Sequence, residues 1–450
     1  MKEDEQIVFG VAKELITPSE RTMMIGFGAV FGVPFADIHD DLFVRTLLLQ
    51  DGAGEKVLLV AMDLLFHDDS LAKALRKYTA EKYGVSEDNL HVSYTHTHFG
   101  PAVKGYDFTW YTESYEMFLL ERACRCIDRA FLNQHRGTLQ FGSVQGEWNI
   151  SRRLQKDGKM YFRPNPDGEC EKNLYLLKLN DESGRMRALV MNFACHASNL
   201  FADAYHSISA EYPGRLCQRI EGEFYGCTAL FFQGFGSDAK LKAGMKSSAF
   251  QQISYDECDE VALSMTARIR NQLLQGKMET LPVQLGSRVF QIELPLDIRA
   301  RSFYEEQSAY YSGTPGKRFC PKQSEGIQDG RNLLWACADY VLDHYDELPE
   351  TVTLNCGVIR INSRFYIASM GGEPGCNIGS VLRENLGEAR VLCFGYNDAI
   401  AYIPSDKMIR EGGYEAEGSV TEYRLKGSIR PGVDALYTAG FRRAIDEIGD

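Results

Sequence analysis

The sequence predicts an α/β fold in which mixed β-sheets are flanked by helices. Apolar runs of strand length alternate with amphipathic stretches of helix length along most of the chain. One strand, helix, strand succession is especially clear, with strands expected at 56–63 and 91–98 and a helix at 70–83. This order is typical of a parallel crossover, so polar groups at the carboxyl ends of its strands should meet at one sheet edge.

Each element is predicted from its own pattern. Residues 56–63 are apolar almost throughout, which suits a strand buried on both faces. Residues 112–134 have apolar side chains at helical spacing, so this helix should pack on a sheet. Ser209 can cap the start of a helix that leads into 215–223. Further strands are expected at 8–16, 42–49, 173–179, 187–196, 228–238, 283–294, 353–361, 365–370 and 390–395, and further helices at 254–274, 332–345 and after Gly375.

The chain is expected to form one domain, 1–450, with two lobes as an option. No internal repeat or dividing linker is evident, and 300–322 has the composition of an insertion. After about residue 395 the chain is interpreted as an irregular tail rich in Gly and Tyr. The 12 cysteines lack the spacing of a disulfide scaffold or a structural zinc site and are interpreted as reduced thiols.

Composition and charge narrow the possible partners. The chain is 44% apolar and 25% charged, which is typical of a globular protein. Its formal net charge of -13 opposes nucleic acid as a partner, because phosphate binding needs clustered Lys and Arg. The charged first residues do not match a signal peptide, and no apolar run reaches the roughly 18 residues of a membrane span. We therefore expect a soluble cytoplasmic protein with a small-molecule substrate; its oligomeric state stays open.

A histidine pair is the strongest functional signal. His96 and His98 are two residues apart at the end of a β-type run, so both imidazoles should point to one side where the backbone turns into a loop. Three later stretches, 191–196, 369–374 and 396–404, each offer a metal donor at the end of a probable strand. The alternative is a pair of histidines satisfied by hydrogen bonds in a loop. His39, Arg45 and Asp63 could orient metal ligands or form a buried ion pair.

Two further stretches could contact a substrate. The strand at 228–238 ends in a glycine-rich elbow, where Gly234 and Gly236 allow close backbone approach and exposed amides could stabilise an oxyanion. Arg152 and Arg153 are adjacent and could bind an anionic or hydroxylated substrate. They could equally be two ordinary arginines on the surface.

Several of these stretches together resemble the amidase domain of the neutral/alkaline, non-lysosomal ceramidase family. The run Thr-His-Thr-His-Phe-Gly-Pro at 95–101 is the most specific of them. The other resembling segments occur in the family's order and extend over nearly the whole chain; they are 9–12, 38–45, 208–214, 233–238, 371–374 and 397–415.

The resemblance implies a single zinc ion held by two histidines, a glutamate and a tyrosine. Matched by motif, these ligands are His96, His196, Glu373 and Tyr402, and His98 stands beside the metal as an orienting group or proton carrier. Without the resemblance, His196 would be taken for a core histidine. Tyr402 is one of 23 tyrosines, and another tyrosine close by could replace it as the fourth ligand.

The chain departs from the family pattern in two places. Ceramidases have a serine two residues after the acid of a Gly-Asp-x-Ser motif, whereas Asp238 is followed by Ala239 and Lys240. Whether Ser237 or Lys240 replaces that serine stays open, and Lys240 could neutralise a negative substrate or lie on the surface. Ceramidases also carry a C-terminal immunoglobulin-like domain, for which this sequence leaves no room. A lipid substrate presented by a membrane is therefore not expected.

These observations predict a zinc-dependent hydrolase. A metal-activated water would attack an amide or ester bond of a small polar N-acyl substrate. His98 or Asp238 would take or return a proton, and the elbow amides from Gly234 to Ser237 would stabilise the oxyanion. The substrate and the bond cleaved are not fixed by the sequence. Two alternatives are a metal-dependent carbohydrate-active enzyme and a non-catalytic homologue that binds a metal or ligand.

Overall fold

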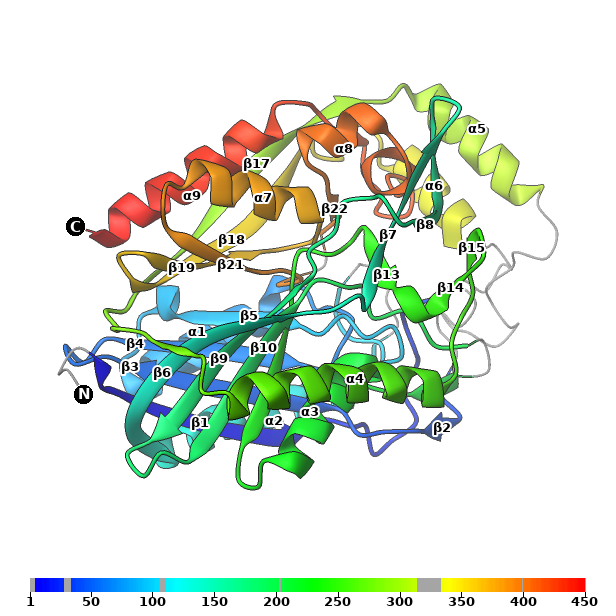
Figure 1. Ribbon diagram of the computed structural model, residues 1–450. Coiled ribbons are helices and arrows are strands. Elements are labelled where there is room, and N and C mark those ends of the chain that lie inside the picture. The colour runs from blue at the N-terminus through cyan, green and yellow to red at the C-terminus, as the bar shows by residue number, and fades with distance from the viewer. Residues whose placement is uncertain are drawn as a thin grey trace.

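The chain forms two β-sheets stacked face to face and covered by helices on their outer faces (Figure 1). This computed structural model describes residues 5–27, 34–105, 111–201, 204, 206–313, 333–398 and 400–449. The mixed α/β class predicted from the sequence is confirmed. The division into one domain of two lobes stays a prediction. None of the helices within the described ranges is long and apolar enough to cross a membrane.

The larger sheet is mixed and has 9 strands. Most neighbours are antiparallel, but β4 pairs β5 in parallel and β10 pairs β12 in parallel. Its order is β12 (Thr228–Gln233), β10 (Met186–Phe193), β9 (Asn173–Asp181), β6 (Gln134–Gln145), β1 (Ile7–Leu15), β3 (Phe43–Gln50), β4 (Lys56–Met62) and β5 (Leu90–Tyr94), with β16 (Glu279–Thr280) on β6.

The smaller sheet has 5 strands, and four short ladders lie outside the two sheets. Its order is β21 (Arg390–Phe394), β19 (Phe365–Met370), β18 (Thr351–Asn362), β17 (Gly286–Ile298) and β23 (Gly427–Ile429). The ladder important for the site contains β13 (Ala239–Leu241), β7 (Asn149–Lys156) and β8 (Lys159–Asn165), and β20 (Glu373–Pro374) pairs β22 (Tyr402–Ile403). Two more pairs are β2 (Asp37–Ile38) with β11 (Ser207–Ile208) and β14 (Met245–Lys246) with β15 (Ala249–Phe250).

Strand β4 shows why the larger sheet is buried on both faces. Leu58 and Val60 belong to the core beneath the helices, whereas Leu59 and Ala61 belong to the core shared with the smaller sheet. Alternate side chains of a strand point to opposite faces, so a strand between two cores must be apolar throughout. The helices on the outer face are α1 (Asp69–Tyr83), α2 (Glu113–Leu132), α3 (Glu211–Glu223) and α4 (Tyr255–Leu274), and the smaller sheet is covered by α7 (Cys376–Asn385) and α9 (Val433–Gly449).

The predicted strand, helix, strand crossover is present as β4, α1 and β5, and its two strands are parallel. The predicted extension of the second strand to residue 98 is wrong, because β5 ends at Tyr94. His96 has a φ of 60°, a left-handed conformation that no strand residue adopts. The two histidines therefore lie in the loop just beyond the sheet edge.

One other expectation differs from the structure, and the expected insertion at 300–322 stays a prediction. The C-terminal part is not an irregular tail, because it contains α8 (Asp406–Glu411) and the long helix α9. Within the expected insertion, residues 301–312 form α5 (Arg301–Ser312), whose Ser308 bonds Asp339 of α6 (Leu333–Asp343). Residues 314–322 of that insertion lie outside the described residues.

The group formed by His39, Arg45 and Asp63 is structural and does not orient the histidine site. Arg45 and Asp63 form a buried ion pair with Nη1 2.6 Å from Oδ2, and Asp63 Oδ2 also accepts from the amide of Phe43. His39 stacks on the ring of Tyr255 with the centroids 3.4 Å apart. Of the two readings that the sequence left open for Arg45 and Asp63, the buried ion pair is the one observed.

A second buried histidine makes stability depend on pH. His67 lies between two carboxylates, with Nε2 2.8 Å from Glu116 and Nδ1 3.0 Å from Asp68. Burial opposes a charge on the ring, but the two carboxylates outweigh it and raise the pKa of His67 to about 9. An unfolded histidine has a pKa of about 6.5, so the ion pairs stabilise fully below that pH and their contribution is lost as pH rises through about 9.

We therefore expect the wild-type protein to lose about 3 kcal/mol of unfolding free energy, relative to His67→Gln, between about pH 6 and pH 10. Urea unfolding of both proteins across this range measures the difference. A constant gap between the two curves would show that the pKa of His67 is the same in the folded and unfolded states.

Candidate metal centre

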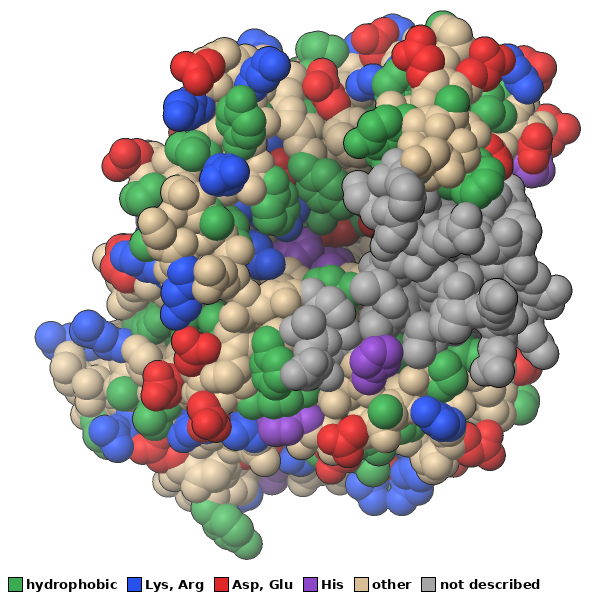
Figure 2. All heavy atoms as spheres, turned by 90° about the vertical axis from the view of Figure 1, so that its right-hand side faces the viewer, with side chains coloured by type: hydrophobic (Ala, Val, Ile, Leu, Met, Phe, Trp, Pro, Cys, Tyr) green, Lys and Arg blue, Asp and Glu red, His purple; other side chains and the backbone are tan. Residues whose placement is uncertain are grey.

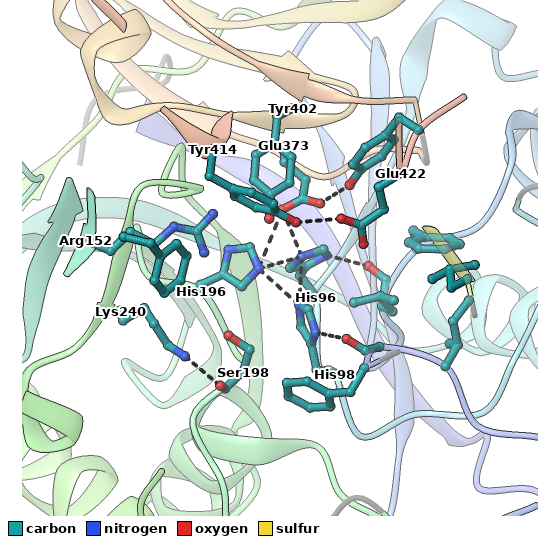
Figure 3. Close-up of a pocket in the computed structure, with 18 residues that line it drawn as sticks. His96, His98, Arg152, His196, Ser198, Lys240, Glu373, Tyr402, Tyr414 and Glu422 are labelled. Atoms are coloured by element: carbon teal, nitrogen blue, oxygen red, sulfur yellow. Dashed lines mark hydrogen bonds and ion pairs between the residues drawn. The ribbon is translucent and has the colours of Figure 1, made fainter. Parts of the chain in front are cut away.

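Three imidazoles converge on one point at the floor of a cavity (Figure 3). The Nε2 atom of His96 lies 3.2 Å from that of His196 and 3.3 Å from that of His98, and the last two are 3.0 Å apart. Glu373 closes the cluster, with Oε2 3.3 Å from His96 Nε2 and 3.5 Å from His196 Nε2. These histidines could bind a metal ion.

The spacing of the donor atoms matches a metal shell. Zinc binds histidine nitrogen at about 2.0–2.1 Å, and a tetrahedron with such bonds places its donors about 3.3 Å apart. The separations among Nε2 of His96, Nε2 of His196 and Oε2 of Glu373 run from 3.2 to 3.5 Å. The donor types also suit zinc, because imidazole and carboxylate are among its usual ligands.

The protonation of the rings supports a cation at this point. Nδ1 of His96 lies 2.8 Å from the carbonyl oxygen of Leu65, and Nδ1 of His98 lies 2.5 Å from that of Gly26. A carbonyl only accepts, so Nδ1 carries the hydrogen in both rings, and a neutral ring held in this way turns its Nε2 lone pair toward the cluster. Burial and nearby positive charge lower the pKa of His98 and His196 well below the usual range, so both rings are neutral. Facing lone pairs repel unless a cation lies between them.

Gln233 at the end of β12 brings the two histidine loops together. Its Nε2 donates to the carbonyl of Thr95 at 3.2 Å and to that of Cys195 at 2.7 Å. These are the residues immediately before His96 and His196, so the fully buried side-chain amide of Gln233 donates hydrogen bonds to both loops. The two loops come from strands β5 and β10, which are distant in the order of the sheet.

Glu373 and Tyr402 lie side by side because β20 and β22 pair in parallel with these two residues in register. Gly372 precedes Glu373 with a φ of +64°, and its amide donates to Oδ1 of Asp398. A side chain at Gly371 would collide with the same carboxylate, so glycine is required there. The ring of Tyr402 lies nearly parallel to that of His196, with the centroids 6.4 Å apart.

The cluster opens into a cavity of about 490 Å³. Figure 2 shows a hollow on this face with histidine and basic side chains at its floor. His96 and His196 are buried, whereas His98 is half-buried and therefore lies on the open side of the cluster. The wall combines apolar and charged side chains; it includes Ile25, Phe27, Leu65, Phe66, Phe162, Leu333, Arg152, Lys240, Tyr402, Tyr414, Glu422 and Tyr423.

Several residues predicted to act in the site do not line this cavity. Both carboxylate oxygens of Asp238 contact Cys376 at the start of α7, and the Ser237 hydroxyl is buried without a hydrogen-bond partner. The amide of Ser237 donates to Pro374, and that of Gly234 donates to Phe193. These two amides are thus used within the fold and are not free for an oxyanion.

Gly236 and Arg153 have structural surroundings as well. A side chain at Gly236 would meet the backbone of Ala194, so this glycine allows two segments to pack closely. Arg153 bonds Glu415, Glu411 and backbone carbonyls of the α8 region. The cavity is lined by Arg152 and Lys240 from this part of the sequence, and not by Gly234, Gly236, Ser237, Asp238 or Arg153.

Sequence reasoning missed part of the polar wall. Glu422 accepts a hydrogen bond of 2.7 Å from the Tyr414 hydroxyl, and burial raises the pKa of this carboxyl above its usual range. Tyr423 donates to Oε1 of Glu373. Tyr414 belongs to a segment that resembles the ceramidases, but Glu422 and Tyr423 carry no signal in the sequence. Gln233 was also missed, although it begins the glycine-rich elbow.

Comparison with known proteins agrees with the predicted resemblance at the level of the fold. No family model and no curated protein matches the sequence. A neutral ceramidase from Pseudomonas aeruginosa matches in structure at 18% identity with a TM-score of 0.71, and a ceramidase complexed with C2 matches at 19% with a TM-score of 0.72. Each match covers 97% of this chain and 74% of the other. The chain therefore has the fold of the ceramidases.

Proposed function

We propose that the protein is a zinc-dependent hydrolase that cleaves an amide or ester bond of a small polar N-acyl substrate. The observation that carries this proposal is the set of converging nitrogen and carboxylate donors at the floor of an open cavity. The ceramidase fold supports it independently. Buried metal ligands and an accessible cavity are the features that distinguish a catalytic zinc site from a structural one.

The zinc ligands in this proposal are His96, His196 and Glu373, with Tyr402 beside them. Two histidines and one glutamate are a known ligand set of catalytic zinc, which keeps one position open. Zinc bound there would polarise a substrate carbonyl and lower the pKa of a water molecule toward neutrality. The hydrogen bonds from Nδ1 of His96 to Leu65 and from Tyr423 to Glu373 would hold the ligands in orientation.

His98 takes the role of proton acceptor. Its Nε2 lone pair points into the cluster while its Nδ1 hydrogen is fixed on Gly26, and the ring borders the open side of the cavity. A neutral imidazole in this orientation accepts a proton from water and returns it to the leaving amine. Ser237 does not line the cavity, so the proposal assigns the attack to water and not to Ser237.

The cavity favours a small polar substrate over a long-chain lipid. Its volume of about 490 Å³ is in the range of sites for small molecules. Arg152, Lys240 and Glu422 bring charges to its wall. Burying a lipid chain against these groups would remove water from them without replacing its hydrogen bonds, which is costly.

Metal removal tests the proposal. We expect protein treated with a chelator to lose at least about 100-fold in kcat/KM, because changes outside the ligand shell alone cost roughly 10–100-fold. Activity should return with one equivalent of zinc. Short N-acyl amino acids, N-acyl sugars and acyl esters are the substrates, and a detergent-dispersed ceramide is the comparison. Activity that survives complete metal removal would contradict the proposal.

Two results of the same experiment would replace the proposal by another function. Zinc binding without turnover of any acyl compound would identify a non-catalytic binding protein. Release of a sugar from a glycoside, with the amide bond intact, would identify a carbohydrate-active enzyme.

A further inference from the structure

Arg152 and Lys240 reach the cavity from two neighbouring strands. In the ladder of β13 and β7, Lys240 is directly opposite Ile150, and Arg152 lies two residues further along β7. Opposite residues share a face of a ladder, and so do residues two apart, so Arg152 and Lys240 are diagonal neighbours on one face. Both line the same wall of the cavity (Figure 3).

The guanidinium of Arg152 is held in place but is only partly hydrogen-bonded. Its Nε donates to Oε1 of Glu415 at 2.8 Å, and its carbon lies 4.6 Å from the ring centre of Phe162 and 5.4 Å from that of Tyr402. The side chain is 3% exposed. Its Nη2 is buried and makes no hydrogen bond of ordinary geometry within the described residues, although the Tyr402 hydroxyl interacts with the guanidinium and raises the pKa of Arg152. A buried donor without a hydrogen bond destabilises the folded state unless a ligand accepts a hydrogen bond from it.

The ammonium of Lys240, unlike the guanidinium of Arg152, has no counter-charge in contact within the described residues. Nζ donates to the carbonyl of Ser198 at 3.0 Å, and no ion pair of Lys240 occurs within the part of the chain that the structure describes. Burial lowers the pKa of Lys240 to about 8, and the positive charge of Arg152 lowers it further in the same direction. An ammonium has three donors, so at least one N–H remains for a ligand.

We propose that Arg152 and Lys240 bind the carboxylate of the substrate, which makes the substrate class N-acyl amino acids. One N–H from Nη2 and one from Nζ match the two oxygens of a single carboxylate. The anion would accept from the remaining donors of both buried cations. Apolar residues such as Leu65, Phe66 and Leu333 line the same cavity and would face the amino-acid side chain or the acyl group.

This inference rests on the proposed function. In the reaction, water adds hydroxyl to the acyl carbon and hydrogen to the nitrogen while the C–N bond breaks, which gives a carboxylic acid and a free amino acid. No oxidant or reductant is required. Lys240 stands where the ceramidases have serine, so the position that differs from the family would carry the difference in substrate.

Paired substrates test the inference. The zinc-loaded enzyme is assayed with N-acetyl derivatives of the standard amino acids and with their neutral carboxamides. Charge-assisted hydrogen bonds of about 1.5–3 kcal/mol predict a preference for the carboxylate of roughly 10-fold to 100-fold in kcat/KM. In Lys240→Met we expect this ratio to fall at least 10-fold, whereas Lys240→Arg keeps most of it because the positive charge remains.

Lys242→Met is the matched control, because this lysine is exposed and pairs with Glu147 outside the cavity. It should keep the wild-type ratio. Since the readout is a ratio within one protein, a partial loss of folded enzyme in Lys240→Met does not change it. An unchanged ratio in Lys240→Met, or equal turnover of acid and carboxamide by the wild type, would overturn the inference and leave the hydrolase proposal intact.

Calorimetry with the metal-free protein separates the two proposals. Suppose that an N-acetyl amino acid binds, that Lys240→Met weakens this binding at least 10-fold, and that the zinc form does not turn the compound over. This result would support the carboxylate site and refute the hydrolase. Failure to bind any of these acids in either form would overturn the inference.

Discussion

The His196→Ala variant is expected to lose its metal and its activity together. The imidazole is 1% exposed, and its Nε2 lies within 3.5 Å of the donor atoms of His96, His98 and Glu373. Removing one of three ligands should weaken zinc binding by more than about 100-fold, beyond the roughly 10–100-fold loss caused by changes outside the ligand shell. We expect kcat/KM to fall at least as far, measured together with zinc affinity by chelator competition.

His135→Ala is the control for this variant, because His135 lies on β6 against the ring of Phe9 and away from the cavity. It should keep both zinc affinity and activity. Thermal unfolding of both variants shows whether any loss is due to unfolding. A folded His196→Ala protein with wild-type zinc affinity would refute the ligand assignment.

The His98→Gln variant is expected to separate catalysis from metal binding. His98 is the half-buried member of the cluster, and the proposal assigns it the proton and not the metal. We expect zinc affinity to change by less than about 10-fold, as for residues beside a ligand shell, while kcat falls by about 100-fold to 10,000-fold, the usual contribution of a general base. Glutamine keeps a hydrogen-bond donor for the Gly26 carbonyl but cannot accept a proton at neutral pH.

The opposite result for His98→Gln is equally informative. Its Nε2 is as close to the other nitrogens as they are to each other, so a His98 that binds the metal would also fit these distances. If zinc is lost from His98→Gln to the same extent as from His196→Ala, the site is a three-histidine centre. The proton acceptor would then have to be another residue of the cavity wall.

Much of the fold could be predicted because burial leaves a direct pattern in the sequence. The apolar run of β4 follows from its position between two cores, and the crossover through α1 follows from the order of the elements. Helix α9 was missed because Gly440 interrupts its pattern. A side chain at that position would collide with Ile292 of β17, so the glycine reflects close packing of the helix on the sheet. Such a contact cannot be inferred from neighbours in sequence.

The candidate site was predictable where a local motif marks it. His96, His98 and His196 lie together. Glu373, which was found by the family resemblance, contacts His96 and His196, and Tyr402 is opposite Glu373 in the β20–β22 pair. The carbonyls that fix the rings belong to Leu65 and Gly26, and a backbone oxygen leaves no trace in residue identity.

The motif around Asp238 does not show whether its carboxylate faces the cavity, as the expected proton transfer requires. Its partner Cys376 is 138 residues away, and only the folded chain shows that both carboxylate oxygens contact that residue. Glu422 reaches the cavity by the same kind of long-range packing. Motif order thus indicated which residues lie near one another, and tertiary packing decided which polar groups face the cavity.

The zinc content of the purified protein, measured by native mass spectrometry before and after the His196→Ala substitution, tests the central claim most directly. The account predicts one zinc ion per wild-type chain and almost none in a folded His196→Ala chain. A wild-type protein that takes up no zinc when the ion is supplied, or a variant that retains a full equivalent, would contradict it.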